Sequence, residues 1–325
     1  MFANRLNNVP GARAGTATGI GAGLIWGVAF LLPEMVAAGS LELTMMRYLV
    51  YGLVSVGLLA WRWTRIRTWL DRALWRTALL FAVTGNLGYY LFVVLGIRLV
   101  GAPATVTIIG SLPVTVAVVG NWRRGDFAFR QLALPLLLVL TGLTFVNGIE
   151  LLSGVARPEA ALAERGLGLA CAGTALALWT SYGVQNAELL RRHPTINSAD
   201  WSTVVGAASL VLALMSTPLA LAIKSVEIGD PGAFLVAAVV LGLIVSWGGT
   251  LLWNHASSRL PAAVTGVLVT VETLSGILYV SAYTLTVPSA LQLVGLGLVV
   301  LGVVQVVRLP GRGGSAPDAT RPSTP

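Results

Sequence analysis

Charged side chains are scarce in this sequence. Only 10% of the 325 residues are Asp, Glu, Lys or Arg, whereas 56% are hydrophobic. An average soluble domain is roughly 25% charged. A chain with so few charges cannot cover the surface of a soluble domain of this length, but helices that face lipid need no charges. The composition therefore predicts a membrane protein, with the lipid bilayer as its main partner.

Cysteine, histidine and lysine are almost missing. The single cysteine, Cys171, excludes an intramolecular disulfide, and two histidines are too few for a Cys/His metal site. The only lysine is Lys224, and no Gly-x4-Gly-Lys-Ser/Thr sequence occurs, which argues against an ATP-driven pump. We expect no cofactor and no bound metal.

Long apolar runs are what the sequence has instead. A helix needs about 20 residues to cross a bilayer, and we predict ten such spans, at 15–37, 42–62, 74–96, 101–121, 131–149, 166–188, 200–223, 232–254, 262–284 and 288–308. The remaining stretches are an N-terminal segment (1–14), a long loop (150–165) and a tail (309–325). The tail is rich in Pro, Gly and Ser, so we expect it to be disordered.

The basic residues lie mostly on one side of these spans. If both termini are cytoplasmic, the outer side holds only Arg47, Arg98, Arg157, Arg165 and Lys224 of the 21 basic residues. Such a bias follows the positive-inside rule and predicts a multi-pass protein of a bacterial-type inner membrane with both termini in the cytoplasm. It also explains the net charge of +8 without a nucleic-acid partner.

The two halves of the chain resemble each other. Residues 22–27 (AGLIWG) resemble 175–180 (ALALWT), and 101–104 (GAPA) resemble 260–263 (LPAA). A shift of 159 residues also brings Pro113 onto Glu272. We therefore predict two five-helix repeats, 15–149 and 166–308. Because five is odd, the second repeat must enter from the opposite side, as in the inverted repeats of secondary transporters.

Aromatic and polar residues inside the spans predict a solute cavity. Trp179, Tyr182 and Asn186 share one helical face, and so do Asn86 and Tyr89. Such faces favour a wet cavity that accepts rings, although ordinary helix packing is the alternative for any one residue. The predicted cavity residues are Trp26, Asn86, Tyr89, Trp179, Tyr182, Trp253, Asn254 and Tyr279.

Glu272 falls at the centre of the span 262–284. A carboxylate at that depth is costly, so an intramembrane ionisable residue is a functional candidate. It could couple transport to protons or contact the ammonium group of an amino acid. The alternative is a neutral carboxyl group that bonds to a neighbouring helix. Tyr279 and Tyr283 share its helical face and extend a polar and aromatic stripe.

Glu34 and Arg47 are expected at similar depth, one near the end of the span 15–37 and the other near the start of 42–62. Intramembrane charges normally find a partner or water. We predict a structural Glu34–Arg47 pair near the outer mouth of the protein. The alternative is that Arg47 attracts the carboxylate of a substrate.

Several of these residues resemble those of a known family. The ten spans, Trp26-Gly27, Arg47 and the mid-span Pro113 are similar to the drug/metabolite transporter superfamily of the EamA-repeat type, over residues 15–308. Tyr89, Trp179-Thr-Ser-Tyr182 and Trp253-Asn254 resemble the YddG-type exporters of aromatic amino acids. Glu272 departs from the pattern, which usually has proline or an uncharged residue there. The resemblance implies export of solutes through a central cavity.

Together these features predict a secondary transporter that exports small organic solutes by alternating access, foremost aromatic and other amino acids. Cationic aromatic drugs or other metabolites are the alternative cargo, since a cation can sit over an indole ring. A channel is less supported because no filter-like polar loop lies between spans. An enzyme is less supported because Glu272 is the only carboxylate at mid-depth, so no cluster of catalytic groups forms.

Overall fold

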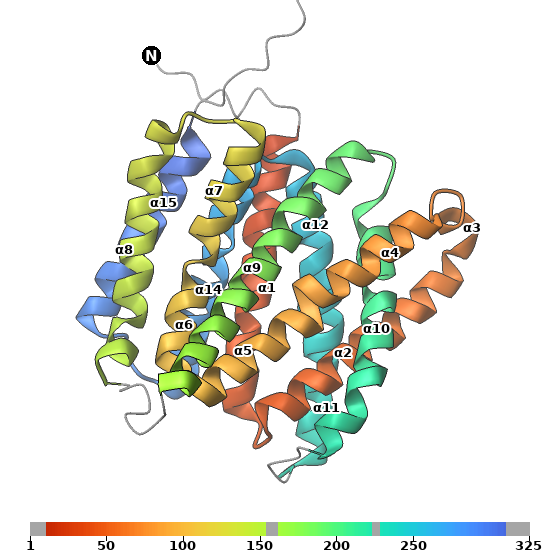
Figure 1. Cartoon of the computed structure of the whole chain (residues 1–325), viewed down its shortest axis with the longest axis horizontal. Helices are drawn as coiled ribbons and strands as arrows, with labels where there is room; N and C mark the ends of the chain where they lie inside the picture. Colours follow the sequence, from red (N-terminus) through yellow and green to blue (C-terminus); the bar gives the residue numbers. More distant parts are fainter. Residues whose placement is uncertain (1–10, 154–161, 223–227, 310–325) are drawn as a thin grey trace, which may run out of the picture.

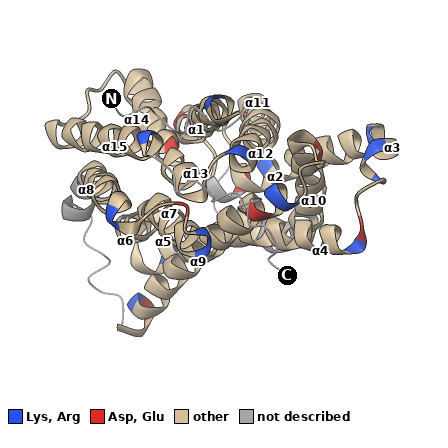
Figure 2. Ribbon diagram, turned by 90° about the horizontal axis from the view of Figure 1, so that it is seen from above, with Lys and Arg blue, Asp and Glu red and all other residues tan. Residues whose placement is uncertain are grey.

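The computed structural model describes residues 11–153, 162–222 and 228–309. Ten helices in this part of the chain are long and apolar enough to cross a membrane, and each overlaps one predicted span. Parts of the predicted N-terminal segment (1–10), long loop (154–161) and tail (310–325) lie outside the described residues. Figure 2 shows how few charged residues the ribbon carries.

Six spans are single helices, and the other four are built from two or three helical segments. In chain order the segments are α1 (Ala12–Met35), α2 (Ser40–Trp61), the short α3 (Trp63–Ile66), α4 (Arg72–Phe81), η2 (Ala82–Asn86), α5 (Leu87–Val100), α6 (Ala102–Gly110), α7 (Leu112–Arg124), α8 (Phe129–Ser153), α9 (Leu162–Arg192), α10 (Ser198–Ala222), α11 (Pro231–Val239), η3 (Val240–Gly248), α12 (Gly249–Arg259), α13 (Ala262–Leu268), α14 (Thr270–Thr284) and α15 (Ala290–Arg308).

The helices pack as two related halves. The fifth and tenth spans, α8 and α15, lie against each other at one side of the bundle, and α2 and α10 do so at the other side (Figure 1). Between them, α1 packs on α12 and α14, while α9 packs on α5, α6 and α7. The chain thus forms an all-α bundle of two inverted five-helix repeats. We call the end where α1 begins and α15 ends the terminal end.

The third span of each half contains a π-helix. These segments are η2 and η3, and η3 shifted back by 159 residues covers 81–89, which includes η2. Each span also starts on an aspartate: Asp71 accepts a 2.7 Å hydrogen bond from the Leu74 amide, and Asp230 accepts one of 2.8 Å from the Gly232 amide. Asp71 and Asp230 are again 159 residues apart, so the two spans share their start and their internal irregularity.

Glycines let α1 approach its neighbours closely. A Cβ atom at Gly19 would lie 2.7 Å from the Leu268 side chain, and one at Gly27 would lie 2.0 Å from the Ser275 hydroxyl. Small residues at such contacts replace the hydrophobic driving force that is missing between helices in lipid. The Ser275 hydroxyl also donates to the carbonyl of Gly23, so α1 and α14 are held at one depth.

Candidate functional site

A cavity of about 340 Å³ lies between the two halves of the bundle. It is lined by α1, α2, α5 to α9, both π-helices, α12 and α14. Small-molecule pockets typically measure about 300–1,000 Å³ and have few polar groups on mostly apolar walls. In size and position this cavity therefore suits a small solute.

Most of the predicted site residues meet at this cavity. Its lining includes Trp26, Arg47, Asn86, Tyr89, Trp179, Tyr182 and Glu272. These come from the first, second, third, sixth and ninth spans, and thus from both repeats. The wall of the cavity therefore combines a cation, a carboxyl group, an amide and several aromatic rings.

Three of the predicted cavity residues lie outside the lining. Trp253 is 1% exposed and forms a floor beneath the cavity, where its ring centroid is 5.4 Å from that of Trp26 and 5.9 Å from that of Trp179. Asn254 is fully buried below it and accepts a 2.8 Å hydrogen bond from Asn186. Tyr279 follows Glu272 by two helical turns, and Phe30 of α1 already covers α14 at Gly276 in between.

The predicted pair of Glu34 and Arg47 does not form. Glu34 is exposed, and no ion pair among the described residues joins it to Arg47. Instead the Nε of Arg47 donates a 2.7 Å hydrogen bond to the Ser246 hydroxyl, and its guanidinium lies 5.5 Å from the centroid of the Tyr48 ring. The reason is that η3 presents Ser246 to α2, which turns Arg47 into the cavity.

Several further polar groups line the cavity that the sequence did not single out. They are Tyr48, Tyr90, Thr105, Asn147, Ser246, Thr250 and Thr273. Their hydroxyl and amide groups at mid-span were the only sequence feature that could have indicated a cavity position. That feature is weak, because an intramembrane Ser or Thr more often bonds to its own helix. Asn86, which was predicted to line the cavity, uses its amide group to hold two helices together: its Nδ2 donates a 2.9 Å hydrogen bond to the Ser209 hydroxyl of α10.

Two glycines make room for the aromatic walls. A Cβ atom at Gly249 would lie 2.3 Å from the indole nitrogen of Trp26, and one at Gly85 would lie 2.6 Å from the ring of Tyr182. Both glycines belong to the π-helical parts of the third and eighth spans or border them. Since no larger residue fits there, these two glycines allow the rings of Trp26 and Tyr182 to take their positions in the cavity wall.

The cavity reaches toward the end opposite the terminal end. Thr105 lies in the first turn of α6, and Asn147 lies in the last part of α8. Both helix ends are at that opposite end of the bundle, whereas the floor of Trp26, Trp179 and Trp253 closes the cavity toward the terminal end.

Below the floor lies a buried polar network. Trp201 donates to Asn186, which in turn donates to Asn254, each at 2.8 Å. Nearer the terminal end, Arg191 donates to the carbonyl of Leu260 at 2.9 Å and joins α9 to the end of α12. These contacts join α9 to α10 and α12, three helices of the second repeat, on the closed side.

No metal site accompanies the cavity within the described ranges, where no three His, Cys, Asp or Glu side chains are grouped suitably. Arg47 and Glu272 provide its ionisable groups suited to binding charges on a solute. The geometry thus offers non-covalent recognition of a small molecule with rings and charges.

Comparison with known proteins places this architecture in a family. The sequence model of the EamA-like transporter family matches residues 13–148 and again 166–308. The inner membrane protein YtfF of Escherichia coli is 34% identical over 300 residues, which cover 88% of this chain and 92% of that protein. A solved crystal structure with 17% identity has the same fold, with a TM-score of 0.70 over 90% of this chain and 96% of its own. This chain is therefore a membrane transporter that belongs to the EamA-like transporter family.

Proposed function

We propose that this protein exports amino acids, foremost aromatic ones, by alternating access through the cavity between its repeats. It would do so in a bacterial-type inner membrane, as the name of its Escherichia coli relative suggests, with both termini in the cytoplasm, as the distribution of arginines favours. Membership of the transporter family supports the proposal that the protein carries a solute. The lining of the cavity supports the proposal that this solute is an amino acid.

The observation that carries the proposal is that Arg47 and Glu272 line one cavity together with Trp26 and Trp179. An amino acid carries a carboxylate, which suits a guanidinium, and an ammonium group, which suits a carboxylate. An aromatic side chain would then stack on the indole rings of the floor. An aromatic amino acid therefore uses all three kinds of partner at once.

The same observation weighs against cationic aromatic drugs as the main cargo. Such a compound would gain from Glu272 and from the aromatic rings. However, it would be repelled by Arg47, whose charge has no carboxylate within ion-pair distance among the described residues. A zwitterion uses both charges, so it matches the cavity better.

Unpaired polar atoms on the closed side support alternating access. Trp253 Nε1, Asn254 Nδ2 and Ser257 Oγ on α12 are buried without a hydrogen-bond partner among the described residues, and so are Nε and Nη2 of Arg191 on α9. Leaving such an atom unpaired costs about 1–3 kcal/mol, and native proteins have few of them. Their alignment along α9 and α12 suggests that water wets this interface in a second state, when the cavity opens toward the terminal end.

The paired π-helices support the same mechanism. Interrupted helices at corresponding positions in two inverted repeats typically surround the transport site, and π-helical segments occur frequently at functional sites. Here η2 contributes Asn86 and η3 contributes Ser246 to the cavity. We infer that the third span of each repeat bends at its π-helix when the two repeats rock against each other.

A transport assay in proteoliposomes tests the proposal. The purified protein is reconstituted and offered radiolabelled phenylalanine, tryptophan, threonine and the cation tetraphenylphosphonium. We expect saturable uptake of amino acids, fastest for the aromatic ones, and little uptake of the cation beyond empty liposomes. Saturable transport of the cation without any amino acid would overturn the choice of solute, and flux that never saturates would indicate a channel.

A further inference from the structure

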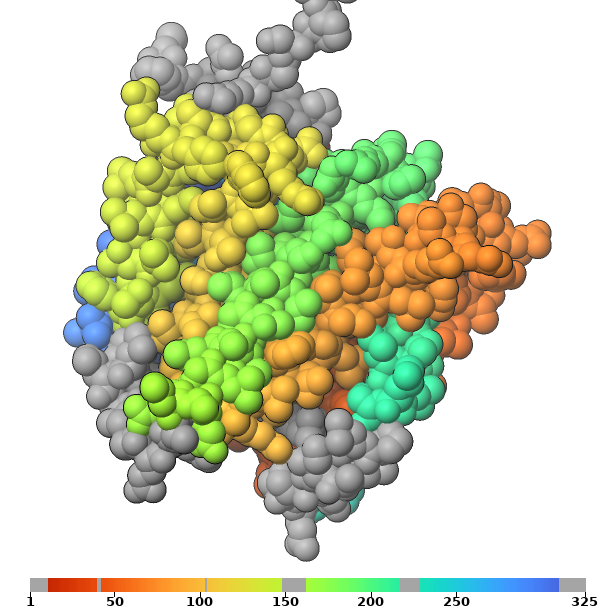
Figure 3. All heavy atoms as spheres, viewed as in Figure 1, coloured from red at the N-terminus to blue at the C-terminus, as the bar shows by residue number. Residues whose placement is uncertain are grey.

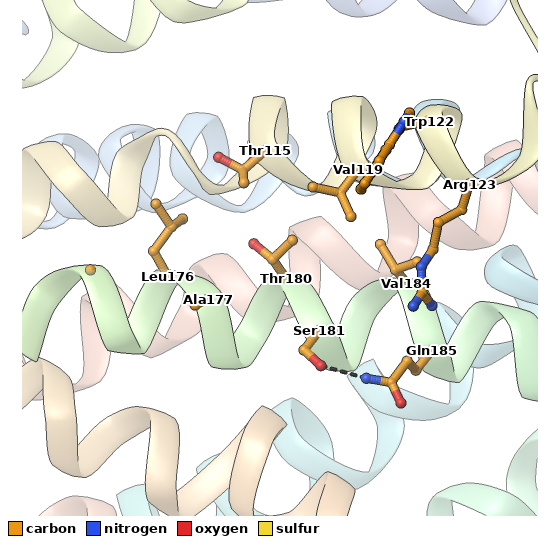
Figure 4. A pocket seen from close by; sticks show the side chains of 11 residues that line it. Thr115, Val119, Trp122, Arg123, Leu176, Ala177, Thr180, Ser181, Val184 and Gln185 are labelled. Atoms are coloured by element: carbon orange, nitrogen blue, oxygen red, sulfur yellow. Dashed lines mark hydrogen bonds between the residues drawn. The ribbon is translucent and has the colours of Figure 1, made fainter.

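A second hollow, of about 410 Å³, lies between α7 and α9 (Figure 4). It shares no lining residue with the solute cavity. Trp122 at its edge is 75% exposed, and Figure 3 shows α7 in yellow and α9 in green side by side on the outer surface. In a bilayer this groove therefore opens to lipid and not to the solute pathway.

The groove is long and mostly apolar. On α9 it runs from Gly173 to Gln185, which at 1.5 Å per residue is about 18 Å. Leu176 and Ala177 lie with Thr115 in the part remote from the terminal end, and Val119 lies nearer to Trp122 (Figure 4). A straight apolar slot between two spans, parallel to the helices, fits a lipid acyl chain.

The groove ends in positive charge. Arg123 and Trp122 lie at the end that is nearest the terminal end, in the last turn of α7 (Figure 4). Arg123 and Arg192 both pair with one carboxylate, Glu188. Two cations on one anion leave an excess positive charge at this mouth, at the depth where indoles and lipid headgroups meet.

Hydroxyl groups follow one helical turn deeper. Ser181 accepts a hydrogen bond from Gln185 and so keeps its own hydroxyl hydrogen for an acceptor in the groove. Thr180 points from α9 toward α7 (Figure 4). It is only 5% exposed, and its hydroxyl has no hydrogen-bond partner among the described residues. Below a phosphate, the next polar groups of a glycerophospholipid are its ester carbonyls, which accept hydrogen bonds.

We propose that this groove is a specific binding site for one anionic glycerophospholipid of the leaflet at the terminal end. Its phosphate binds at Arg123, its ester carbonyls accept hydrogen bonds from Ser181 and Thr180, and one acyl chain fills the slot down to Gly173. Basic pockets between spans bind anionic lipid headgroups by the same physics. The site is independent of the solute that the cavity transports.

Native mass spectrometry of the purified full chain in detergent tests the site. The probes are palmitoyl-oleoyl phosphatidylglycerol and the phosphatidylcholine with identical chains, titrated separately to give an apparent Kd for the first bound lipid. We expect the anionic lipid to bind more tightly. Because one basic residue near a headgroup contributes about 1 kcal/mol, Arg123→Gln should weaken binding of the anionic lipid about fivefold.

A second variant blocks the acyl chain and leaves the charge in place. A Cβ atom at Gly173 would meet nothing within 4 Å, so Gly173→Leu fits without strain and fills the slot. Gly57 on α2 is equally open but outside the groove, and Arg130 is an exposed arginine outside the groove. Gly57→Leu and Arg130→Gln are therefore the matched controls. We expect both controls to bind lipid as the wild type does, and Gly173→Leu to lose tight binding of both lipids.

The outcomes decide the proposal in either direction. Equal binding of the two lipids by the wild type would refute headgroup recognition. Wild-type binding by both groove variants, or an equal loss in the controls, would show non-specific annular lipid and overturn the site. If Arg123→Gln or Gly173→Leu elutes as an aggregate, Ala177→Leu is measured instead, because it fills the same slot from an exposed position. Loss of tight lipid binding by Ala177→Leu supports the site, and wild-type binding overturns it.

Discussion

The Nε of Arg47 donates a 2.7 Å hydrogen bond to the hydroxyl of Ser246, and so links α2 of the first repeat to η3 of the second across the cavity. The same hydroxyl in turn donates to the carbonyl of Leu241, five residues earlier within η3. The position of the cationic group thus depends on the irregular helix of the other half.

Removal of the charge at Arg47 should weaken amino-acid binding most. Hydrogen bonds to charged groups contribute about 1.5–3 kcal/mol, so Arg47→Gln should raise KM for amino acids by about tenfold to a hundredfold. Ser246→Ala keeps the charge and removes only its anchor, so a smaller rise is expected. Initial rates in proteoliposomes measure both. If Arg47→Gln transports amino acids with an unchanged KM, the guanidinium does not bind the carboxylate.

Glu272→Gln separates proton coupling from solute binding. If Glu272 carries a coupled proton, the variant should lose every response to a pH gradient and still exchange internal for external amino acid. If Glu272 binds the ammonium group, both activities should fall, with a raised KM. A structural carboxyl would leave both intact, because glutamine keeps its size and hydrogen-bonding capacity. Gradient-driven uptake and exchange are measured on the same vesicles.

Adjacent glycines give a matched test of the cavity wall. Gly249→Ala would place a methyl group 2.3 Å from the Trp26 indole nitrogen, and this indole is confined by Trp179 and Trp253. Overpacking of this kind costs about 1–3 kcal/mol. Gly248→Ala meets its nearest atom at 3.7 Å, an ordinary contact. The first variant should therefore lose thermal stability and transport, whereas the second should keep both. Equal behaviour of the two would contradict the tight Gly249–Trp26 contact.

The helical spans could be predicted from the sequence because each one must satisfy its own backbone hydrogen bonds in lipid. The residues that converge on the cavity were also partly predictable, since Trp26, Trp179 and Glu272 are costly or unusual at mid-span. The positions of Trp253 and Asn254 were not. Their depth beneath the cavity depends on how α12 packs on α1 and α9, and the pattern of a single span does not show how spans pack on one another. The contact of Arg47 with Ser246 was hidden for the same reason.

Cysteine labelling tests the orientation in the membrane. Cys171 is buried and is first replaced by alanine. Arg124 and Thr286 are exposed and lie at opposite ends of the bundle. In intact cells a membrane-impermeant thiol reagent should reach Thr286→Cys but not Arg124→Cys, and it should reach both after the cells are broken. The reverse pattern would place the termini outside, and labelling of both in intact cells would contradict the ten-span topology.

The last prediction concerns the preference for aromatic solutes. Trp179 lies between the rings of Trp26, at 6.5 Å, and Tyr182, at 5.7 Å, and it lines the cavity. Stacking of a solute ring adds about 0.5–1.5 kcal/mol per pair beyond the burial of area. Trp179→Leu, which keeps an apolar side chain, should therefore reduce phenylalanine and tryptophan transport about twofold to tenfold relative to threonine transport. The ratio between solutes is the proper measure, because a general defect in folding lowers all rates alike. Trp69, which packs on Trp201 away from the cavity, provides the control: Trp69→Leu should leave the ratio unchanged. If Trp179→Leu slows aromatic and aliphatic solutes equally, the rings of the floor hold the fold and do not select the cargo.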